Sequence, residues 1–354
     1  MKIPARPAIA YYVSAHGYGH GVRSCGIIRA LNRLYPEIGV EVVSALPPDF
    51  LFSQIDASKN SLRPGSFDIG MKQIDSIRVD VPATLDAVRR LCSRRSEEVE
   101  SEAERLRRRG IGLVVADIPA LPIEAAARAG IPRLAVGNFS WDWIYEEFIA
   151  QDAAWGPVTE GFREQYAQTD LLLRLPFCDA MRAFRRVEDI PLVASPGLAR
   201  RPEIAAATGA MPGKKWVLLS FTSLEWTEDA LDRVERLREY EFFTVRPLEW
   251  SRQNVHPLNR RRMGFSDIVA SVDAVISKPG FGILSDCIAN GKPLIYADRS
   301  DFREYPVLVN AVRRFLRHVH IPAGELYRGD LAESLNLIWD RPEPGESCPL
   351  GGER

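Results

Sequence analysis

The chain has 354 residues, 46% hydrophobic and 26% charged, with a formal net charge of −1, a composition ordinary for a globular protein and a length that favours two domains. The nearly neutral charge gives no reason to expect nucleic acid as a partner, no apolar run approaches the length of a transmembrane segment, and the first residues lack the layout of a signal peptide. The five cysteines are scattered and form no C-x-x-C pair, which argues against a disulfide framework or a structural zinc site and favours a cytoplasmic protein.

The first half of the chain alternates predicted strands and helices, beginning with an apolar strand over residues 8–13. A glycine-rich turn follows, and then a helix whose apolar residues recur at steps of three and four. Further along, the sequence predicts strands over 39–45, 74–81, 112–118 and 133–136, and helices over 82–109 and 121–129. Repeated strand–helix–strand units predict a parallel sheet with helices on both faces.

A second series of the same kind begins near residue 213. It has predicted strands over 216–221, 242–245, 273–276 and 293–296, and predicted helices over 227–238, 265–270, 281–290 and 304–316. We interpret residues 1–190 and 213–340 as two domains, residues 191–212 as a Pro/Gly/Ala-rich linker, and residues 341–354 as a disordered tail. The predicted fold class is α/β, with two Rossmann-like, doubly wound domains facing a central cleft.

The turn after the first strand carries both glycines and histidines. It reads S-A-H-G-Y-G-H-G and contains His16, Gly17, Gly19 and His20. A strand, a glycine-rich turn and a helix bring backbone close to a ligand at the carboxyl end of a parallel sheet, and an imidazole can act as a base near neutral pH. The two histidines have the H-x-x-x-H spacing of helical zinc ligands, but the glycines argue against a helix there and therefore against zinc. A structural role or a sugar contact stays open for His16.

Polar and aromatic residues follow two later strands of the first domain. Asp117 ends its strand at the carboxyl side, where it could orient a histidine or bind an acceptor. Asn138, Trp141 and Asp142 lie in the aromatic segment N-F-S-W-D-W-I-Y, after the strand that ends at residue 136. Indole faces stack well on sugar and base rings, although packing in the core is an equally good interpretation of this segment.

A second glycine-rich turn, S-K-P-G-F-G-I-L-S-D, runs from residue 277 to residue 286 between a strand and a helix. The free N–H groups of such a helix start form a site for a diphosphate, and Asp286 lies where a carboxylate could reach ribose hydroxyls. Glycine also serves the backbone of an ordinary β–α turn, which is the alternative interpretation. Arg303 and Glu304 belong to a charged cluster after the next strand, which would either face the same cleft or form an exposed loop.

The order of these motifs resembles a known family. S-K-P-G-F-G, A-N-G-K-P-L-I-Y and R-E-Y-P are similar to the donor domain of nucleotide-sugar glycosyltransferases of the GT-B fold, including the class that makes lipid II with UDP-N-acetylglucosamine. The first glycine turn, N-F-S-W-D-W-I-Y and R-L-P resemble the glycosyltransferase-like domain that precedes the sugar kinase in plant L-arabinokinases, and its stand-alone bacterial relatives. The resemblance runs from about residue 8 to residue 340.

The resemblance implies an inverting glycosyltransferase that takes its sugar from a nucleotide-diphosphate sugar, with a UDP-sugar favoured and no cofactor required. In this family a histidine near the acceptor hydroxyl matches His20, which we expect to be the base, with His16 and Asp117 as further catalytic candidates. The acceptor-side candidates are Gly17, Gly19, Asn138, Trp141 and Asp142. No pair of aspartates has D-x-D spacing, so we expect no metal ion. The sequence does not name the acceptor, the sugar or the oligomeric state.

The resemblance also assigns donor-binding residues. Gly280 and Gly282, with Lys278, fall on the diphosphate turn, Asp286 matches the acidic residue that binds the donor ribose, and Arg303 and Glu304 lie where donor-sugar hydroxyls are read.

One departure from the family pattern lies after the first strand of the second domain. This strand normally ends in a glycine-rich turn that cradles phosphate, but residues 219–224 here read L-S-F-T-S-L. The hydroxyls of Ser220, Thr222 and Ser223 could serve as donors instead. The missing glycines keep a second interpretation open, a non-catalytic module that binds or senses a nucleotide sugar. A third and weaker one is a nucleotide-sugar epimerase.

Overall fold

In the computed structural model, which describes residues 9–258, 263–299 and 302–353, the chain divides into two compact units. Unit 1 consists of Met1–Lys72, Asp80–Val193 and Gly351–Arg354, and unit 2 of Gln73–Val79 and Ala194–Leu350. The chain therefore passes from one unit to the other after residues 72, 79, 193 and 350. Residues 73–79, which belong to unit 2 although both flanking segments belong to unit 1, are called the strap below.

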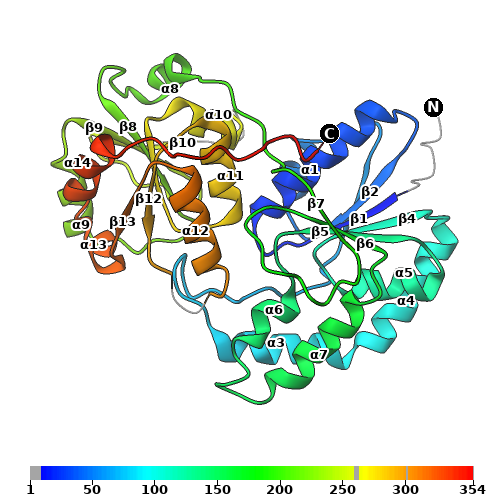
Figure 1. The fold of residues 1–354 in the computed structure, drawn as a ribbon. Helices are drawn as coiled ribbons and strands as arrows, with labels where there is room; N and C mark the ends of the chain where they lie inside the picture. The colour runs from blue at the N-terminus through cyan, green and yellow to red at the C-terminus, as the bar shows by residue number, and fades with distance from the viewer. Residues whose placement is uncertain (1–8, 259–262, 300–301, 354) are drawn as a thin grey trace. The chain divides into compact units, whose positions relative to one another are not determined.

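Unit 1 is built on a seven-stranded sheet in which every paired strand is parallel to its neighbour. The strands lie in the order β3-β2-β1-β4-β5-β6-β7 (Figure 1). They are β1 (Ile9–Val13), β2 (Val40–Ser44), β3 (Ser61–Pro64), β4 (Leu113–Asp117), β5 (Arg133–Gly137), β6 (Leu171–Arg174) and β7 (Val187–Asp189). Because β1 pairs with both β2 and β4, the strand order reverses between β1 and β4, and ligands of doubly wound folds bind at the carboxyl ends of strands at such a point.

Helices cover both faces of this sheet, with α1 on one face and α4 and α5 on the other (Figure 1). The helices are α1 (Tyr18–Leu34), α2 (Pro48–Phe52), α3 (Val81–Ser93), α4 (Arg95–Arg109), α5 (Leu121–Ala129), α6 (Trp141–Glu146) and α7 (Trp155–Tyr166). The apolar stripes of α4 and α5, which include Val99, Leu106 and Leu121, pack on Tyr12 and Val114 of the central strands. The predicted single helix over 82–109 was wrong, because the backbone leaves the helical region at residue 94 (φ −102°, ψ 2°) and two helices result.

Unit 2 repeats this architecture with a six-stranded parallel sheet in the order β10-β9-β8-β11-β12-β13. Its strands are β8 (Lys215–Ser220), β9 (Tyr240–Val245), β10 (Val255–Leu258), β11 (Ala274–Ser277), β12 (Leu294–Ala297) and β13 (His318–Ile321). Here the order reverses between β8 and β11, so the loops that follow these two strands meet at the carboxyl edge of the sheet.

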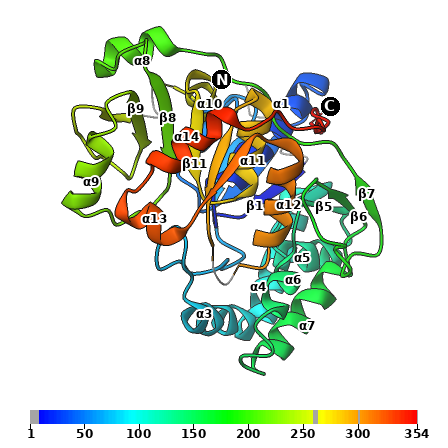
Figure 2. The same cartoon turned by 60° about the vertical axis from the view of Figure 1, so that its left-hand side comes forward.

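The helices of unit 2 also lie on two faces, with α11 and α12 on the opposite side of the sheet from α9 and α13 (Figure 2). They are α8 (Arg201–Thr208), α9 (Glu228–Glu235), α10 (Phe265–Ser271), α11 (Phe281–Asn290), α12 (Tyr305–Phe315), α13 (Ala323–Arg328) and α14 (Ala332–Asp340). The core between the sheet and α9, α13 and α14 contains Leu219, Leu231, Leu326 and Leu335, and also Ile77 of the strap.

The strap was predicted to be part of a strand over 74–81, and this prediction was wrong. Its apolar and polar residues do alternate, but Asp75 folds the chain into a turn because its carboxylate accepts hydrogen bonds from the backbone N–H groups of Ile77 and Arg78, both at 2.8 Å. An aspartate that binds the backbone two residues ahead favours turns over strands. Only an isolated antiparallel bridge, Gln73 with Val79, closes the turn.

The predicted linker and tail both contain ordered contacts. Helix α8 lies inside the segment 191–212. In the tail, Arg314 and Glu346 form an ion pair of 2.6 Å, and the N–H groups of Gly351 and Gly352 donate to the carbonyl of Leu192.

Candidate functional site

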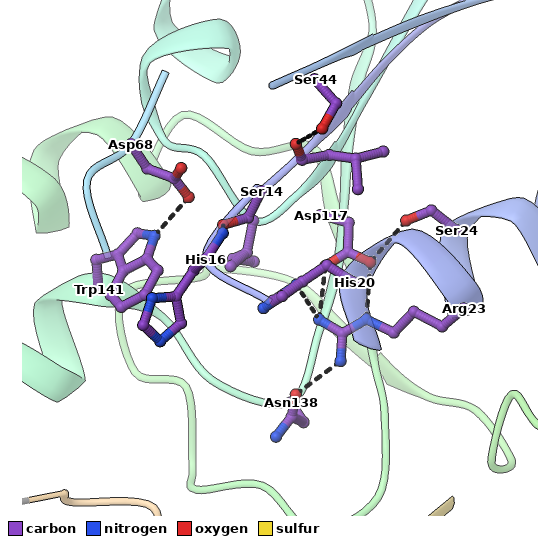
Figure 3. Close-up of polar contacts among 12 residues, drawn as sticks. Ser14, His16, His20, Arg23, Ser24, Ser44, Asp68, Asp117, Asn138 and Trp141 are labelled. Atoms are coloured by element: carbon purple, nitrogen blue, oxygen red, sulfur yellow. Dashed lines mark hydrogen bonds and ion pairs between the residues drawn. The ribbon is translucent and has the colours of Figure 1, made fainter. Parts of the chain in front are cut away.

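The polar centre of unit 1 lies where β1 and β4 end side by side. Val13, the last residue of β1, is paired with Asp117, the last residue of β4. Helix α1 begins at Tyr18, which places His20 in its first turn. His20 Nδ1 lies 2.7 Å from Asp117 Oδ1, with both side chains buried (Figure 3). The sequence left two roles open for Asp117, orienting a histidine or binding an acceptor, and the structure places its carboxylate against the imidazole of His20.

Arg23 clamps the same carboxylate from the next turn of α1. Its Nε and Nη2 atoms donate to the two oxygens of Asp117 at 2.7 and 2.6 Å, and the Ser24 hydroxyl adds a third hydrogen bond at 2.8 Å. Burial alone would raise the pKa of Asp117, but the charges and hydrogen bonds of Arg23 and His20 outweigh it and hold that pKa well below its ordinary value. Asp117 is therefore an ionised acceptor inside the protein.

The ionised carboxylate fixes how the proton on His20 is placed. The Nδ1 atom of His20 lies near both Asp117 Oδ1 and the Nη2 group of Arg23, the latter at 2.9 Å. A guanidinium only donates and a carboxylate only accepts, so Nδ1 cannot satisfy both. The negative charge of Asp117 favours Nδ1–H as a donor to the carboxylate, and the Nε2 atom of His20 is then left to accept a proton.

Asn138 joins this centre from a third strand end, because it directly follows β5. Its Oδ1 atom accepts a hydrogen bond of 2.9 Å from Nη1 of Arg23, and its side chain is only 1% exposed. We predicted Asn138 on the acceptor side from its position after a strand. In the structure its side-chain oxygen binds Arg23, and Arg23 in turn binds the carboxylate of Asp117.

His16 lies next to the aromatic segment. Its ring meets the edge of Trp141 at a centroid distance of 5.4 Å, and the Trp141 indole N–H donates to Asp68 Oδ2 at 3.0 Å (Figure 3). Trp141 is 1% exposed and stacks on Tyr145 on another side. Its indole therefore supports the His16 loop from within the core. Burial raises the pKa of Asp68 above its ordinary value, and the hydrogen bonds from Ser14 and Trp141 offset only part of this rise.

The remaining acceptor-side candidates have distinct environments. Gly17 caps α1 in an extended conformation, with open space where a side chain would stand. Gly19 and Gly21 lie inside α1, so the expectation of a non-helical turn through them was wrong. A Cβ at Gly21 would lie 2.6 Å from the Phe50 ring, which shows that this glycine serves close packing. Asp142 is buried 3.7 Å from Arg163, and burial raises its pKa.

Sequence reasoning missed Arg23, Ser24 and Asp68. Arg23 had a detectable signal, because it lies three residues after His20 and side chains at that spacing share one helix face. Asp68 lies in an irregular segment before the strap and carries no pattern that separates it from an ordinary loop aspartate.

In unit 2, the loop after β8 is occupied by the strap. The hydroxyl oxygen of Ser76 accepts hydrogen bonds from the backbone N–H groups of Thr222 (3.1 Å) and Ser223 (2.8 Å), and it lies 3.2 Å from the Thr222 hydroxyl. The carbonyl of Ser220 accepts a hydrogen bond from Ser277. The loop that lacks the family's glycines thus has its successive backbone donors paired with an internal serine oxygen.

The second glycine turn leads from β11 into α11 as predicted. Gly280 is the N-cap of α11 in an extended conformation, no side chain caps the helix start, and Gly282 lies in the first turn. Asp286 lies in the following turn and is partly exposed. Burial lowers the pKa of Lys278 well below its ordinary value, and nearby Arg299 lowers it further.

Arg303 and Glu304 precede α12, and Glu304 is its N-cap residue with a buried side chain. In the part of the chain that the structure describes, no group of three or more His, Cys, Asp or Glu side chains could hold a metal ion. No described helix combines the length and apolar character needed to span a bilayer.

Comparison with solved structures places these two units in one fold. The calicheamicin glycosyltransferase CalG4 superimposes with a TM-score of 0.59 over 94% of this chain and 90% of its own, at 14% identity. A UDP-glucosyltransferase from Polygonum tinctorium gives 0.63 over 95% and 90%, also at 14% identity. The chain has the GT-B fold. The predicted α/β class with two Rossmann-like, doubly wound domains is confirmed. The glycosyltransferase VinC, solved in complex with dTDP, is similar at 0.60, with 14% identity over 93% of this chain and 90% of its own.

Sequence comparison gives a relative that is more similar in sequence. The chain is 31% identical over 359 residues to L-arabinokinase of Arabidopsis thaliana, a match that covers 97% of this chain and 33% of that protein. The predicted resemblance to plant L-arabinokinase is thereby confirmed, although this GT-B chain spans only about a third of the length of the relative it matches. No family model matches the sequence.

Proposed function

We propose that this GT-B protein is an inverting, metal-independent glycosyltransferase, which transfers a sugar from a nucleotide-diphosphate sugar to a hydroxyl or amine of a small acceptor. The observation that carries the proposal is the buried pair of His20 and Asp117 at the carboxyl ends of β1 and β4. Asp117, held ionised by Arg23, orients the imidazole so that Nε2 can accept a proton.

The proposed reaction is a single displacement. Nε2 of His20 takes the proton from the acceptor while the acceptor atom forms a bond to the anomeric carbon. The bond between that carbon and the phosphate oxygen of the donor breaks, and the nucleoside diphosphate leaves with the electron pair. A positioned base of this kind contributes on the order of 10²–10⁴ in rate. Because attack and departure occur on opposite faces of the sugar ring, the anomeric configuration inverts.

Unit 2 is proposed to bind the donor. The open start of α11, with Lys278, Gly280 and Gly282, would hold the diphosphate, since helix N-termini bind anions. Asp286 would accept hydrogen bonds from the ribose, and Arg303 and Glu304 would contact the sugar. We favour a UDP-sugar, because proteins of this fold have been solved with UDP ligands, among them a transferase from Siraitia grosvenorii in complex with UDP and UGT2 of Phytolacca americana with UDP-2fluoro-glucose.

The test begins with a thermal-shift panel of UDP, GDP, ADP, CDP and dTDP and their sugars. The nucleotide sugar that contains the stabilising nucleotide is then prepared with a labelled sugar, and mass spectrometry is used to find the acceptor that receives the label. His20→Ala is expected to lower kcat at least about a hundredfold with donor affinity nearly unchanged, because only the base is lost. His318→Ala, a histidine of β13 that contacts the Leu316 carbonyl, is the matched control and should keep wild-type turnover.

Asp286→Ala separates the two halves of the proposal, because it should weaken nucleotide binding while leaving the His20 centre intact. Unchanged turnover in His20→Ala would remove the base assignment. A donor that binds but is transferred to no acceptor would instead support the second candidate, a non-catalytic nucleotide-sugar-binding module. The observation that favours this module is the occupation of the β8 loop by Ser76.

A further inference from the structure

Asp68 is a buried carboxylate beside the turn that follows β1 in unit 1. Its side chain is 5% exposed, and the Trp141 indole N–H donates to its Oδ2 atom at 3.0 Å (Figure 3). The Ser14 hydroxyl donates to the same carboxylate. Both donors are neutral groups, so among the described residues no arginine or lysine in direct contact takes up the charge of Asp68.

Through Ser14, Asp68 holds the turn that leads into α1. Ser14 directly follows β1, and its N–H group donates to the carbonyl of Asp117 at 2.7 Å. Its hydroxyl oxygen accepts a hydrogen bond from the N–H group of His16 at 3.3 Å. Helix α1 begins without a side-chain cap, so this turn fixes its start. An acceptor for the Ser14 hydroxyl therefore helps to position His20 in the first turn of the helix.

The charges of Arg23, Asp117 and His20 do not balance once His20 is protonated. Arg23 and Asp117 form an ion pair of 2.6 Å, so their formal charges cancel. When His20 accepts a proton, as the proposed reaction requires, this buried group gains one positive charge in total. A buried charge that nothing compensates is costly. A second carboxylate nearby would remove that cost.

Asp68 lies close enough to His20 for the two charges to act on each other. Burial raises the pKa of Asp68, and the hydrogen bonds from Ser14 and Trp141 lower it. A charge on His20 lowers this pKa further, and the charge of Asp117 raises it. The influence between two titratable groups is reciprocal, so an ionised Asp68 favours the protonated form of His20.

The remaining titratable groups around Asp68 cannot supply the same charge. They are His16 in the turn after β1, Tyr145 of α6 and Tyr166 of α7. Burial raises the pKa of each tyrosine well above its ordinary value, so both are uncharged near neutral pH. A histidine adds only positive charge. Of the groups named here, Asp68 is therefore the one that can balance a protonated His20.

We propose that Asp68 is a positioning residue of the His20 centre, which balances the charge of the imidazolium and holds the turn after β1 through Ser14. In the proposed reaction, Nε2 of His20 gains the proton that the acceptor loses, while Asp68 stays a carboxylate and exchanges no proton. The inference rests on the proposed function for the source of that proton. The effect of Asp68 on His20 is a property of the protein without substrate, and it is measured as such.

The test follows the protonation of His20 by NMR of the protein with isotope-labelled histidine. The chain contains five histidines, and the signal that is lost in His20→Ala belongs to His20. Asp68→Asn keeps the size of the side chain and removes its charge. We expect the pH midpoint of the His20 titration to fall in this variant by at least about half a pH unit, roughly a threefold loss of proton affinity.

Glu102→Gln is the matched control. Glu102 of α4 is also a buried carboxylate of unit 1, 6% exposed, and it accepts hydrogen bonds from Arg63 and from the Tyr12 hydroxyl of β1. Its charge is paired with Arg63, so its loss should leave the His20 midpoint at the wild-type value. An equal shift in both variants, or no shift in Asp68→Asn, would overturn the proposal. A wild-type His20 that stays uncharged at every pH at which the protein is folded would overturn it as well.

Ser14→Ala separates the charge of Asp68 from its hold on the turn. This variant keeps the carboxylate, so its His20 midpoint should lie closer to the wild-type value than that of Asp68→Asn. Once an acceptor is known, its kcat should fall at least about tenfold, because the base is no longer held in place. A wild-type kcat in Ser14→Ala would contradict the hold on the turn. Asp68→Ser removes the same charge and should shift the midpoint in the same direction, which keeps the proposal testable if Asp68→Asn does not fold.

This proposal and the proposed function fail in distinguishable ways. A protein that transfers sugar to no acceptor, but shows the lowered His20 midpoint in Asp68→Asn, would contradict the glycosyltransferase and leave the charge balance by Asp68 standing. A protein that transfers sugar, with an unchanged midpoint in Asp68→Asn, would contradict only the role of Asp68. In an active protein, Asp68→Asn should also move the rising limb of kcat/KM to lower pH and leave donor affinity unchanged.

Discussion

Gly70 shows how a single residue without a side chain positions a candidate site residue. Its backbone has φ of +70°, and a Cβ added there would lie 2.3 Å from Nδ1 and 3.0 Å from Cβ of His16. Rotating the imidazole would relieve the first contact and leave the second. Gly110 has nearly the same φ, +66°, but ends α4 in open space. The two glycines therefore have the same backbone conformation, but only Gly70 has a side chain, that of His16, where its own Cβ would stand.

We expect Gly70→Ala to destabilise the protein more than Gly110→Ala. Both replacements cost about 1–2 kcal/mol for a left-handed backbone that bears a side chain, but only Gly70→Ala must also displace the His16 loop. Urea unfolding of both variants measures the difference. Equal losses of unfolding free energy would show that the loop moves away freely, and would contradict a fixed position for His16.

The residues around His20 show which features of single residues can be predicted from the sequence and which cannot. His20 and Asp117 were both named as candidates from the sequence, His20 in the glycine-rich turn that follows an apolar strand and Asp117 at the end of another apolar strand, where ligands of parallel sheets bind. Their mutual contact, and the clamp by Arg23, join positions 97 and 94 residues apart. No local pattern reports which of several strand ends will be neighbours, so the partner of each side chain was not predictable.

At the scale of the elements, the strap is the clearest departure from what the sequence predicts. It is neither a strand nor a free loop, because three consecutive side chains bind it to the rest of unit 2. Asp75 binds the Tyr327 hydroxyl at 2.9 Å, Ser76 binds the loop after β8, and Ile77 is buried in the core of unit 2. Ile74, three residues earlier, is 57% exposed.

The strap therefore offers a controlled test of its own anchoring. Ile77→Ala should lower the unfolding free energy by about 2–5 kcal/mol, the range for truncating a buried isoleucine. Ile74→Ala, on the same segment and with the same change of chemistry, should alter it by less than about 0.5 kcal/mol. Chemical unfolding followed by tryptophan fluorescence measures both. A similar effect of the two changes would mean that the strap is not packed into the core.

For the whole molecule, the four crossings of the chain mean that unit 2 is not a continuous piece of sequence. Its continuous part, residues 194–350, lacks the strap, while the N–H groups of Gly351 and Gly352 near the end of the chain donate to the carbonyl of Leu192 in unit 1. A domain boundary drawn in the Pro/Gly/Ala-rich segment divides the chain where its composition changes. Such a boundary separates Ile77, which is buried in the core of unit 2, from the rest of that core.

We expect a fragment of residues 194–350 to be less stable than the same fragment with residues 73–79 attached through a flexible Gly/Ser linker. The attached strap restores the Ile77 contact and pairs the N–H groups of Thr222 and Ser223 again. Circular dichroism during urea unfolding compares the two fragments. A third fragment that carries the strap with Ile77→Ala is the control, and it should fall between them. Identical unfolding of all three would show that unit 2 does not depend on the strap.

The sequence by itself determined the alternation of strands and helices, the two doubly wound domains, the strand-end positions of Asp117, Asn138 and Lys278, and the place of His20 in the segment after the first strand. Those features depend on the period of apolar residues and on glycines and prolines close in the chain, which act locally. The tertiary structure alone decided that Arg23 clamps Asp117, that Ser76 fills the β8 loop and that Arg299 is a buried cation beside Lys278. Each of these depends on which strand ends lie side by side and on how much water they exclude. Such contacts arise between distant residues, and their energies are set by burial that no short stretch of sequence records.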